Sequence, residues 1–507
     1  MEIQMQEFFL DSPGAGGANE RVSGSKIDNN QSARPDSSTL PLLNVHTNSI
    51  GEIVQRNGYT VYAGQLTTTD NICGLFQYRK YNGNEYELAC GNQSTTKHIY
   101  DISTPGSPSD IIGAATFTAD TMFSFAVVAD TLIMTTDDRD TPLKWAGSGN
   151  VASLGGTPPV GKFCAEFYNY GFIANTSANP ERLYWSNLYT PETWTGTDFY
   201  RANDAITGLG RSQDNLFIFT RRGIIVAKYT GDSLSPFTFD ILDTDIGCLA
   251  PHSIVHANQT IYWVGNDNHV YKMNGYTPQR VTEIIPTTLS EINAAVISKC
   301  TAVENRELRH IWFFVPKGSA TTNDFVIVYD YLNEQLFFFD NMDANYAAVF
   351  QESTGQLKVY FGDRTGRVYL TNTGNTDYLE GTSTAINAYK YTKLFNLGTA
   401  ARAKRFRGCR VTVNAQGSCI STIALSGDFG NTGGEVLTVN HATNSDTIGT
   451  FIIGTSYLGG SENTRSDNDC STTARYLQLK IAHQQNSIPF SMRDLTLYFQ
   501  EYGGGHR

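Results

Sequence analysis

The sequence carries little charge and no long apolar run. Charged residues make up 17% of its 507 positions, and the formal net charge is −12. An acidic chain without a long block of one sign is poorly suited to hold nucleic acid by neutralising phosphates. No apolar stretch approaches the roughly 18 to 20 residues that span a bilayer. The first ten residues, MEIQMQEFFL, also lack the basic start of a signal peptide, so we expect neither a membrane span nor a leader.

The cysteines form no CxxC pair and no dense framework. Eight of them are scattered along the chain: Cys73, Cys90, Cys164, Cys248, Cys300, Cys409, Cys419 and Cys470. This scattering indicates buried thiols in a reducing cytosol, with the disulfide set of a secreted protein as the alternative.

Helical periodicity is nearly absent. Residues 286–300 (PTTLSEINAAVISKC) predict one short helix, with Ser290 as a candidate cap. Elsewhere short runs of β-branched and aromatic residues alternate with turns rich in Gly, Asn and Asp. The sequence therefore predicts an all-β protein, and its length favours roughly two to four domains.

Three segments of the chain differ in composition and in the pattern of apolar residues. Residues 1–39 contain a stretch of Gly, Ser, Asn, Asp and Pro with almost no large apolar side chain, which predicts a flexible N-terminal arm. Residues 40–379 predict a β-propeller. Residues 380–507 contain strands of alternating apolar and polar positions, which predict a C-terminal antiparallel β-sandwich. We expect that deletion of residues 1–39 would spare folding but impair assembly.

The propeller prediction depends on a recurring pattern, in which an apolar strand ends in an aromatic residue and a polar turn follows. Successive aromatic anchors lie about 40 to 45 residues apart, with one longer step, which is the length of a four-stranded blade. The anchors are Tyr100, Trp145, Trp185, Tyr229, Tyr271, Tyr329 and Tyr369. Six or seven blades would fit, and a long stacked β-sandwich or solenoid is the alternative.

Candidate catalytic and metal-binding groups are few. His252 and His256 could form a metal pair only on a helix, and their neighbours favour a strand, so packing is the preferred interpretation. Carboxylates cluster at Asp137, Asp138 and Asp140, at Asp240, Asp243 and Asp245, and at Asp340 and Asp343. Their contexts favour turn hydrogen bonds over a hydrolase pair. We expect no catalytic residue, no metal site, no cofactor and no enzyme activity.

The densest basic segment is a candidate subunit interface or phosphate-contact face. It consists of Arg402, Lys404, Arg405, Arg407 and Arg410. Alternation along a strand would place several of these side chains on one face, where they could meet an acidic surface of another subunit. A solvated face is the alternative.

Several long stretches resemble the tail nozzle or tail hub proteins of short-tailed bacteriophages, of the tail tubular protein B type. The first opens with Asn44, Gly51, Ile53, Arg56 and Gly58. The most specific part extends from Trp185 to Cys248 and begins with WSNLYTPETWTGTDFY, residues 185–200, which contains Trp185 and Trp194. These positions look like folding determinants: glycines permit turns and aromatics fill spaces between strands. A carbohydrate-binding use of Trp185 and Trp194 is the alternative.

The resemblance implies a β-propeller virion component in the phage tail, assembled in the host cytoplasm. About six copies would form a ring below the portal and adaptor. The ring would carry fibres or a plug and act as a conduit for genome ejection. An acidic lining would attract passing DNA only weakly. The competing hypotheses are a receptor-directed glycan-binding or depolymerising propeller and a cellular propeller scaffold.

Overall fold

A computed structural model describes most of the chain as strands. The described residues are 5–11, 16–21, 31–36, 38–66, 71–93, 96–117, 121–212, 214–379, 381–398, 401–414, 419–428, 432–441, 463–483 and 491–501. Strands make up 54% of the structure and helices 4%. The all-β prediction is confirmed.

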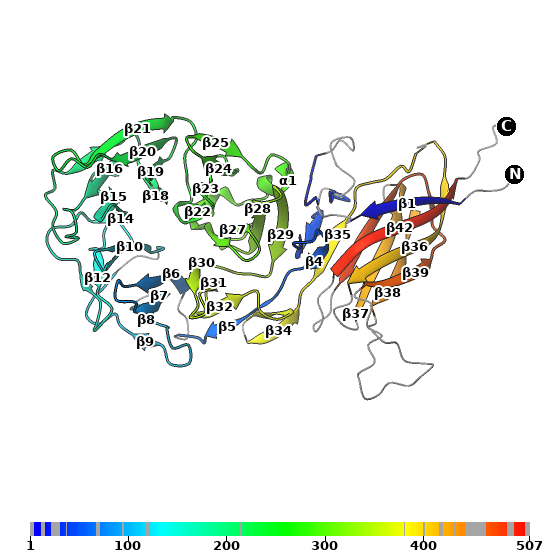
Figure 1. The fold of residues 1–507 in the computed structure, drawn as a ribbon, viewed down its shortest axis with the longest axis horizontal. Helices are drawn as coiled ribbons and strands as arrows, with labels where there is room; N and C mark the ends of the chain where they lie inside the picture. Colours follow the sequence, from blue (N-terminus) through cyan, green and yellow to red (C-terminus); the bar gives the residue numbers. More distant parts are fainter. Residues whose placement is uncertain are drawn as a thin grey trace.

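Seven sheets follow one another along the chain and surround a common axis (Figure 1). In the first six, four consecutive strands pair in chain order, each antiparallel to the next. Blade 1 contains β6 (Asn71–Arg79), β7 (Glu85–Gln93), β8 (Thr96–Asp101) and β9 (Ser109–Asp110). Blade 2 contains β10 (Ser124–Val128), β11 (Thr131–Thr135), β12 (Leu143–Trp145) and β13 (Ala152–Ser153). Blade 3 contains β14 (Gly161–Phe167), β15 (Tyr170–Thr176), β16 (Arg182–Trp185) and β17 (Phe199–Arg201).

The next three blades repeat this arrangement. Blade 4 contains β18 (Ile206–Ser212), β19 (Asn215–Thr220), β20 (Ile224–Tyr229) and β21 (Phe237–Asp243). Blade 5 contains β22 (Val255–Ala257), β23 (Thr260–Val264), β24 (Val270–Asn274) and β25 (Thr277–Arg280). Blade 6 contains β26 (Thr301–Asn305), β27 (His310–Val315), β28 (Phe325–Asp330) and β29 (Gln335–Asp340).

The seventh blade joins distant parts of the chain. It contains β30 (Tyr346–Gln351), β31 (Leu357–Gly362), β32 (Val368–Thr371) and β5 (Tyr59–Ala63). The hairpin of β33 (Thr376–Leu379) and β34 (Thr382–Ala385) extends the same sheet beyond β5. Because β5 precedes blade 1 in the sequence, its antiparallel pairing with β32 closes the ring.

The aromatic anchors share one place in the blades. All seven lie on the third strand, that is, on β8, β12, β16, β20, β24, β28 and β32 in turn. Anchor side chains fill spaces between strands and between blades. Trp185, for example, contacts Phe172 of its own blade and Phe237 of blade 4, with ring centroids 6.3 and 5.5 Å away. Large aromatic side chains bury much area at such seams, which favours a repeated aromatic position in each blade.

The predicted helix is divided in two. α1 (Pro286–Ser290) begins with proline at its first turn, and the 3₁₀ helix η3 (Ala294–Lys299) follows. Ser290 is the last residue of α1, so its predicted capping position is wrong. Asn293 is the side-chain cap instead, because its carboxamide oxygen accepts a hydrogen bond from the backbone N–H of Ala295.

The remaining strands form two sheets beside the ring, which we call the C-terminal β-domain (Figure 1). One sheet has the order β3 (Val45–Thr47), β4 (Ile53–Gln55), β42 (Ser491–Glu501), β36 (Lys404–Asn414) and β39 (Asn463–Asp469), with β1 (Gln6–Asp11) on β42 and β40 (Thr473–Ala474) on β36. The other has the order β2 (Leu42–Leu43), β35 (Ala388–Tyr391), β41 (Leu477–His483), β37 (Cys419–Gly427) and β38 (Thr432–His441). Inward side chains of both sheets, such as Val411, Ile423 and Leu497, belong to one hydrophobic cluster.

Strands from the start of the chain therefore belong to this domain. β2 and β4 pair with the C-terminal strands β35 and β42, and β3 pairs with β4, although the sequence predicts residues 40–379 to be propeller throughout. Short apolar runs such as those at Leu42 and Ile53 are similar in both domains, because the sequence of a strand does not specify which distant strand it pairs with.

Aromatic side chains of different blades meet across the axis of the propeller. Tyr346 of blade 7 lies 5.5 Å from His252 and 6.5 Å from Phe125 of blade 2, measured between ring centroids. His252 belongs to the 3₁₀ helix η2 (Pro251–Ser253), which leads into blade 5. These blades are not neighbours in the ring, so their contact fills the space between them.

Candidate functional site

The basic segment lies on β36 of the C-terminal β-domain, and strand alternation divides it. Lys404 points inward and is fully buried. Its Nζ donates hydrogen bonds to the carbonyl oxygens of Asn396, at 2.5 Å, and Arg475, at 3.3 Å. Burial lowers the pKa of Lys404. Lys404 thus binds two loops to the sheet and does not contribute to the outer face of β36.

Three of the arginines point outward. Arg405 and Arg407 alternate with the buried Phe406, as a strand requires. A bulge between Phe406 and Gly408 then shifts the alternation, so that Arg410 also lies on the outer face. Arg402 precedes the strand and forms an exposed ion pair with Glu501, at 3.3 Å.

The outer face contains a shallow pocket of about 240 Å³. The Arg410 guanidinium lies over the ring of Tyr498, 5.1 Å from its centroid, and Arg407 Nε donates a hydrogen bond to Gln500 at 3.3 Å. The lining residues are Met5, Arg407, Gly408, Cys409, Arg410, Asn468, Asp469 and Tyr498. Arginine and tyrosine are the residue types that carry most energy at protein interfaces, so this pocket is a candidate contact surface.

The strongest polar network lies between the propeller and the C-terminal β-domain, a region that we call the junction. Arg56 is only 2% exposed and donates to both carboxylate oxygens of Asp377, at 2.7 and 2.6 Å. It also donates to Asn44 Oδ1 at 2.8 Å and to the carbonyl oxygen of Asp340 at 2.9 Å. Asn44 in turn donates to the Asp340 carboxylate and to the carbonyl oxygen of Asn387. Two motif residues, Asn44 and Arg56, therefore join β29, β33 and the chain leading into β35.

The surroundings of this network are tightly packed. Burial raises the pKa of Asp340, although hydrogen bonding from Asn44 opposes the shift. Gly58 allows the closest approach of two backbones, since a Cβ there would lie 1.8 Å from the carbonyl oxygen of Thr376. Ile53 has no exposed surface and belongs to the main hydrophobic cluster. Asn44, Ile53, Arg56 and Gly58 thus have structural surroundings, and their role as folding determinants stays a prediction.

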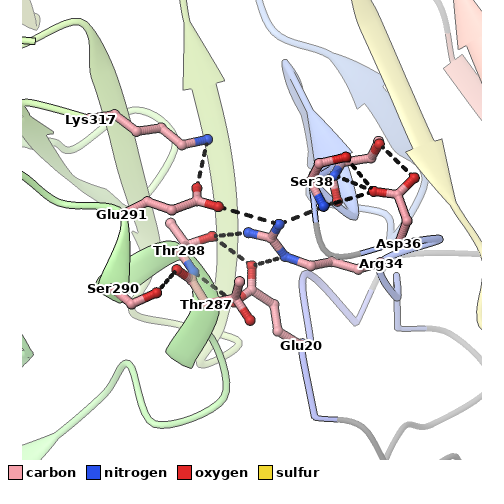
Figure 2. Close-up of polar contacts among 10 residues, drawn as sticks. Glu20, Arg34, Asp36, Ser38, Thr287, Thr288, Ser290, Glu291 and Lys317 are labelled. Atoms are coloured by element: carbon pink, nitrogen blue, oxygen red, sulfur yellow. Dashed lines mark hydrogen bonds and ion pairs between the residues drawn. The ribbon is translucent and has the colours of Figure 1, made fainter. Parts of the chain in front are cut away.

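Described parts of the predicted arm also reach the junction. Figure 2 shows Glu20 and Arg34 against α1. Arg34 Nε lies 2.8 Å from Glu20 Oε1, and its Nη2 donates to Thr288 Oγ1 at 2.9 Å. Glu20 accepts from both the backbone N–H and the hydroxyl of Thr288, at 2.9 and 2.6 Å. Glu291 extends the cluster, 3.7 Å from Arg34 and 3.2 Å from Lys317.

Backbone bonds attach the same segment to both domains. Ala18 N–H donates to the carbonyl oxygen of Leu336 in blade 6, and Ser32 forms an antiparallel bridge with Thr392 beside β35. Ahead of it, β1 pairs with β42 along its whole length. The structure thus gives residues of the 1–39 segment fixed contacts that their composition did not indicate. We call residues 16–21 and 31–36 the clasp.

The two tryptophans of the most specific segment pack inside the propeller. Trp194 is 8% exposed, donates from Nε1 to the carbonyl oxygen of Pro191 at 2.8 Å, and belongs to a cluster shared by blades 2 and 3. Trp185 is half-buried in the cluster shared by blades 3 and 4. A sugar-binding platform requires a ring that lies open on the surface, and neither of these two rings does.

The other candidate groups have structural surroundings. His252 is half-buried, with a pKa lowered to about 4 by desolvation, and His256 lies on β22 with Nε2 3.4 Å from Ser212 Oγ. Asp243 accepts hydrogen bonds from the backbone of its own turn, and Asp137 pairs with Arg139. Within the described ranges, no three His, Cys, Asp or Glu side chains are placed to hold a metal ion. None of the described helices has the length and apolarity to cross a membrane.

The cysteines are buried where the structure describes them, as predicted. Seven are buried and form no disulfide within the described residues: Cys73, Cys90, Cys164, Cys248, Cys300, Cys409 and Cys470. Burial raises the pKa of Cys164 and of Cys248 to about 12, which keeps both thiols protonated at neutral pH. The side chain of Cys419 lies outside the described part of the chain.

Comparison with known proteins gives one family. Residues 50–315, just over half of the chain, match the model of the family described as bacteriophage P22 Gp10, beta-propeller. The matched segment begins in the turn between β3 and β4 and ends with β27 of blade 6. No curated protein sequence matches the chain.

Several solved structures are similar in part. The AfRom2 CNH domain has 12% identity and a TM-score of 0.39, over 63% of this chain and 100% of that one. The extracellular domain of the hybrid two-component system BT4673 from B. thetaiotaomicron has 9% identity and a TM-score of 0.43, over 69% and 42%. PorZ from Porphyromonas gingivalis has 10% identity and a TM-score of 0.37, over 68% and 44%. With TM-scores below 0.5, these similarities carry no inference about function.

Proposed function

Because the chain belongs to the bacteriophage P22 Gp10 β-propeller family, we propose that it forms the tail nozzle or tail hub of a short-tailed phage. In this proposal about six copies form a ring below the portal and adaptor, through which the genome leaves. The ring is non-enzymatic, carries fibres or a plug, and resides in the virion tail after assembly in the host cytoplasm. Family membership by itself supports the coarser statement that the chain is a phage structural protein.

The contact of side chains across the propeller axis is the observation that favours a ring of copies. Tyr346, His252 and Phe125 meet across that axis, so a single propeller offers no passage to a duplex. A conduit built from this chain must therefore lie between subunits. The net charge of −12 fits that use, because a strongly basic lining would bind phosphates along the path and slow the DNA.

The contacts at the junction support a component whose two domains stay joined when force acts on the tail. The Arg56–Asp377 pair and the clasp join the propeller to the C-terminal β-domain through buried, charge-assisted hydrogen bonds. The outer face of β36, with Arg405, Arg407 and Arg410, is then available as a contact surface for a neighbouring subunit. Head-to-tail contacts of this kind generate closed rings.

Electron microscopy of the purified protein, alone and mixed with portal and adaptor, tests the proposal. Rings, or density at the tail tip, are expected for the natural chain. Replacing Arg407 and Arg410 by glutamate should reduce ring formation and leave the melting curve unchanged. Arg201→Glu on blade 3, where the side chain is 69% exposed, is the matched control. A monomer that clears capsular polysaccharide would contradict the nozzle and favour the depolymerising propeller.

A further inference from the structure

The junction holds two buried histidines in contact. His46 lies on β3 of the C-terminal β-domain, and His310 lies on β27 of blade 6. Their ring centroids are 5.3 Å apart with the planes at 85°, and the residues are 5% and 0% exposed. Because the two rings come from different domains, a charge on either one acts across the junction.

The surroundings of the pair suit neutral rings. His46 Nδ1 lies 3.1 Å from the carbonyl oxygen of Thr47. Neither ring nitrogen of His310 has a hydrogen-bond partner among the described residues. Phenylalanines of β29 provide further ring contacts: Phe339 lies 6.3 Å from His46, and Phe337 lies 6.2 Å from His310. An imidazolium in this setting would be charged, desolvated and poorly bonded.

One carboxylate lies near the pair. Asp330 of β28 is the register partner of His310, but its oxygens accept hydrogen bonds from its own turn. The neighbouring strands β4 and β26 place the uncharged Val54 opposite His46 and the uncharged Asn305 opposite His310. Glu52, in the turn of the β3–β4 hairpin, accepts hydrogen bonds from Asn48 and Ser491. Arg309 precedes His310 in the chain, but its side chain is exposed.

The direction of the electrostatic effect follows from these contacts. Burial lowers the pKa of His46, while the Thr47 carbonyl and the Asp330 charge oppose the shift. Burial lowers the pKa of His310 well below its usual value, and the neighbouring His46 lowers it further. Groups with a lowered pKa in the folded state stabilise it above their unfolded pKa, near 6.5, and this stability is lost as the pH falls below that value.

We propose that protonation of the His46–His310 pair loosens the junction, so that mild acid releases the contact between β3 and blade 6. Blades 1 and 2 share one hydrophobic cluster and blades 3 and 4 share another, and both are separate from the cluster that blade 6 shares with the C-terminal β-domain. Acid therefore opens the junction before it unfolds the ring. This inference does not depend on the proposed function.

Hydrogen–deuterium exchange at pH 7.5 and pH 5.0, corrected for the intrinsic rate, tests the proposal. Peptides covering residues 45–55 and 305–315 should exchange faster in acid, while those from blades 2 to 4 should not. One histidine that is protonated only in the open state raises the opening constant about 30-fold between these pH values. If exchange accelerated equally in all peptides, or did not accelerate in the junction peptides, the natural protein alone would overturn the proposal.

Two substitutions sharpen this test. His310→Phe removes a titratable ring whose nitrogens have no described partner, so it should fold, and acid should open its junction less than that of the natural chain because only His46 remains to be protonated. His252→Phe is the matched control, since the pKa of His252 is also lowered by burial but the residue lies at the propeller axis; its junction peptides should respond to acid as in the natural chain. Equal acid opening in the His310→Phe and natural proteins would exclude the pair as the cause. If His310→Phe fails to fold, His46→Phe provides the same comparison.

Discussion

Arg56 and Asp377 lie 321 positions apart and form a buried bidentate ion pair that joins the first folded segment to the end of the propeller. Removing one partner of such a pair leaves the other charge buried without compensation.

We therefore expect Arg56→Met to lower the free energy of unfolding by about 3–5 kcal/mol. Denaturant titration followed by tryptophan fluorescence measures this loss. Arg201→Met is the control, because Arg201 is exposed and its ion pair with Glu181 contributes at most about 1 kcal/mol. Equal losses in the two variants would show that the buried pair has no special importance.

Deletion of residues 1–39 should now have a different outcome from that expected of a flexible arm. The deletion removes the buried Ala18 and Glu20 and leaves the end of α1 without its partners. We expect a lower soluble yield and a lower melting temperature. Deletion of residues 1–4 alone is the control. An unchanged melting curve after the longer deletion would show that the clasp contributes nothing to folding.

Trp194→Ala should lower stability by about 3–5 kcal/mol, as expected for a large buried aromatic side chain. Trp185→Ala, at a half-buried ring between blades, should also be destabilising. Tyr189→Ala in the same loop is the control, since Tyr189 is 59% exposed and surface changes cost about 0.5 kcal/mol or less. Lost glycan binding with unchanged melting in the tryptophan variants would support the carbohydrate alternative instead.

Lys390→Met should stabilise the protein at neutral pH by about 1 kcal/mol or more, because a buried amine without a partner is costly. Lys390 is fully buried on β35, and its Nζ has no hydrogen-bond partner among the described residues. Burial lowers its pKa well below 10.5, so the natural chain gains stability as the pH rises toward 10.5. The variant should lose this part of the pH dependence, as thermal melts between pH 7 and 10 would show.

Lys404→Met gives the contrasting case. Lys404 is also buried, but its amine donates to two carbonyl oxygens that the substitution would leave unsatisfied. We expect destabilisation. If both lysine variants changed stability in the same direction, hydrogen bonding would not explain the difference between the two sites.

The repeat could be predicted from the sequence because it is local. Each anchor, such as Tyr271 or Tyr369, follows an apolar strand and precedes a polar turn, and both features fall within one short window. The outward direction of Arg405 and Arg407 follows from the same local alternation. Arg410 follows it only through a bulge, which the sequence around Gly408 does not specify.

The junction could not be predicted because its partners are far apart in the chain. Glu20 and Arg34 lie in a segment whose composition is typical of disorder, and their contact is Thr288, more than 250 positions later. Only a family motif indicates Asn44 and Arg56. The sequence does not indicate that His46 and His310 lie together, since an isolated histidine in a strand does not reveal its neighbours.

The pairing of β5 with β32 has a consequence for synthesis. Thr60 pairs with Leu370, so during translation at ~5–20 residues per second the early strand waits roughly 15–60 s for its partner to leave the ribosome. Blades 1 to 6 can form in order during that time, whereas the last one cannot. A nascent chain truncated before residue 368 should therefore expose an unpaired strand, which makes it a natural client for chaperones in the producing cell.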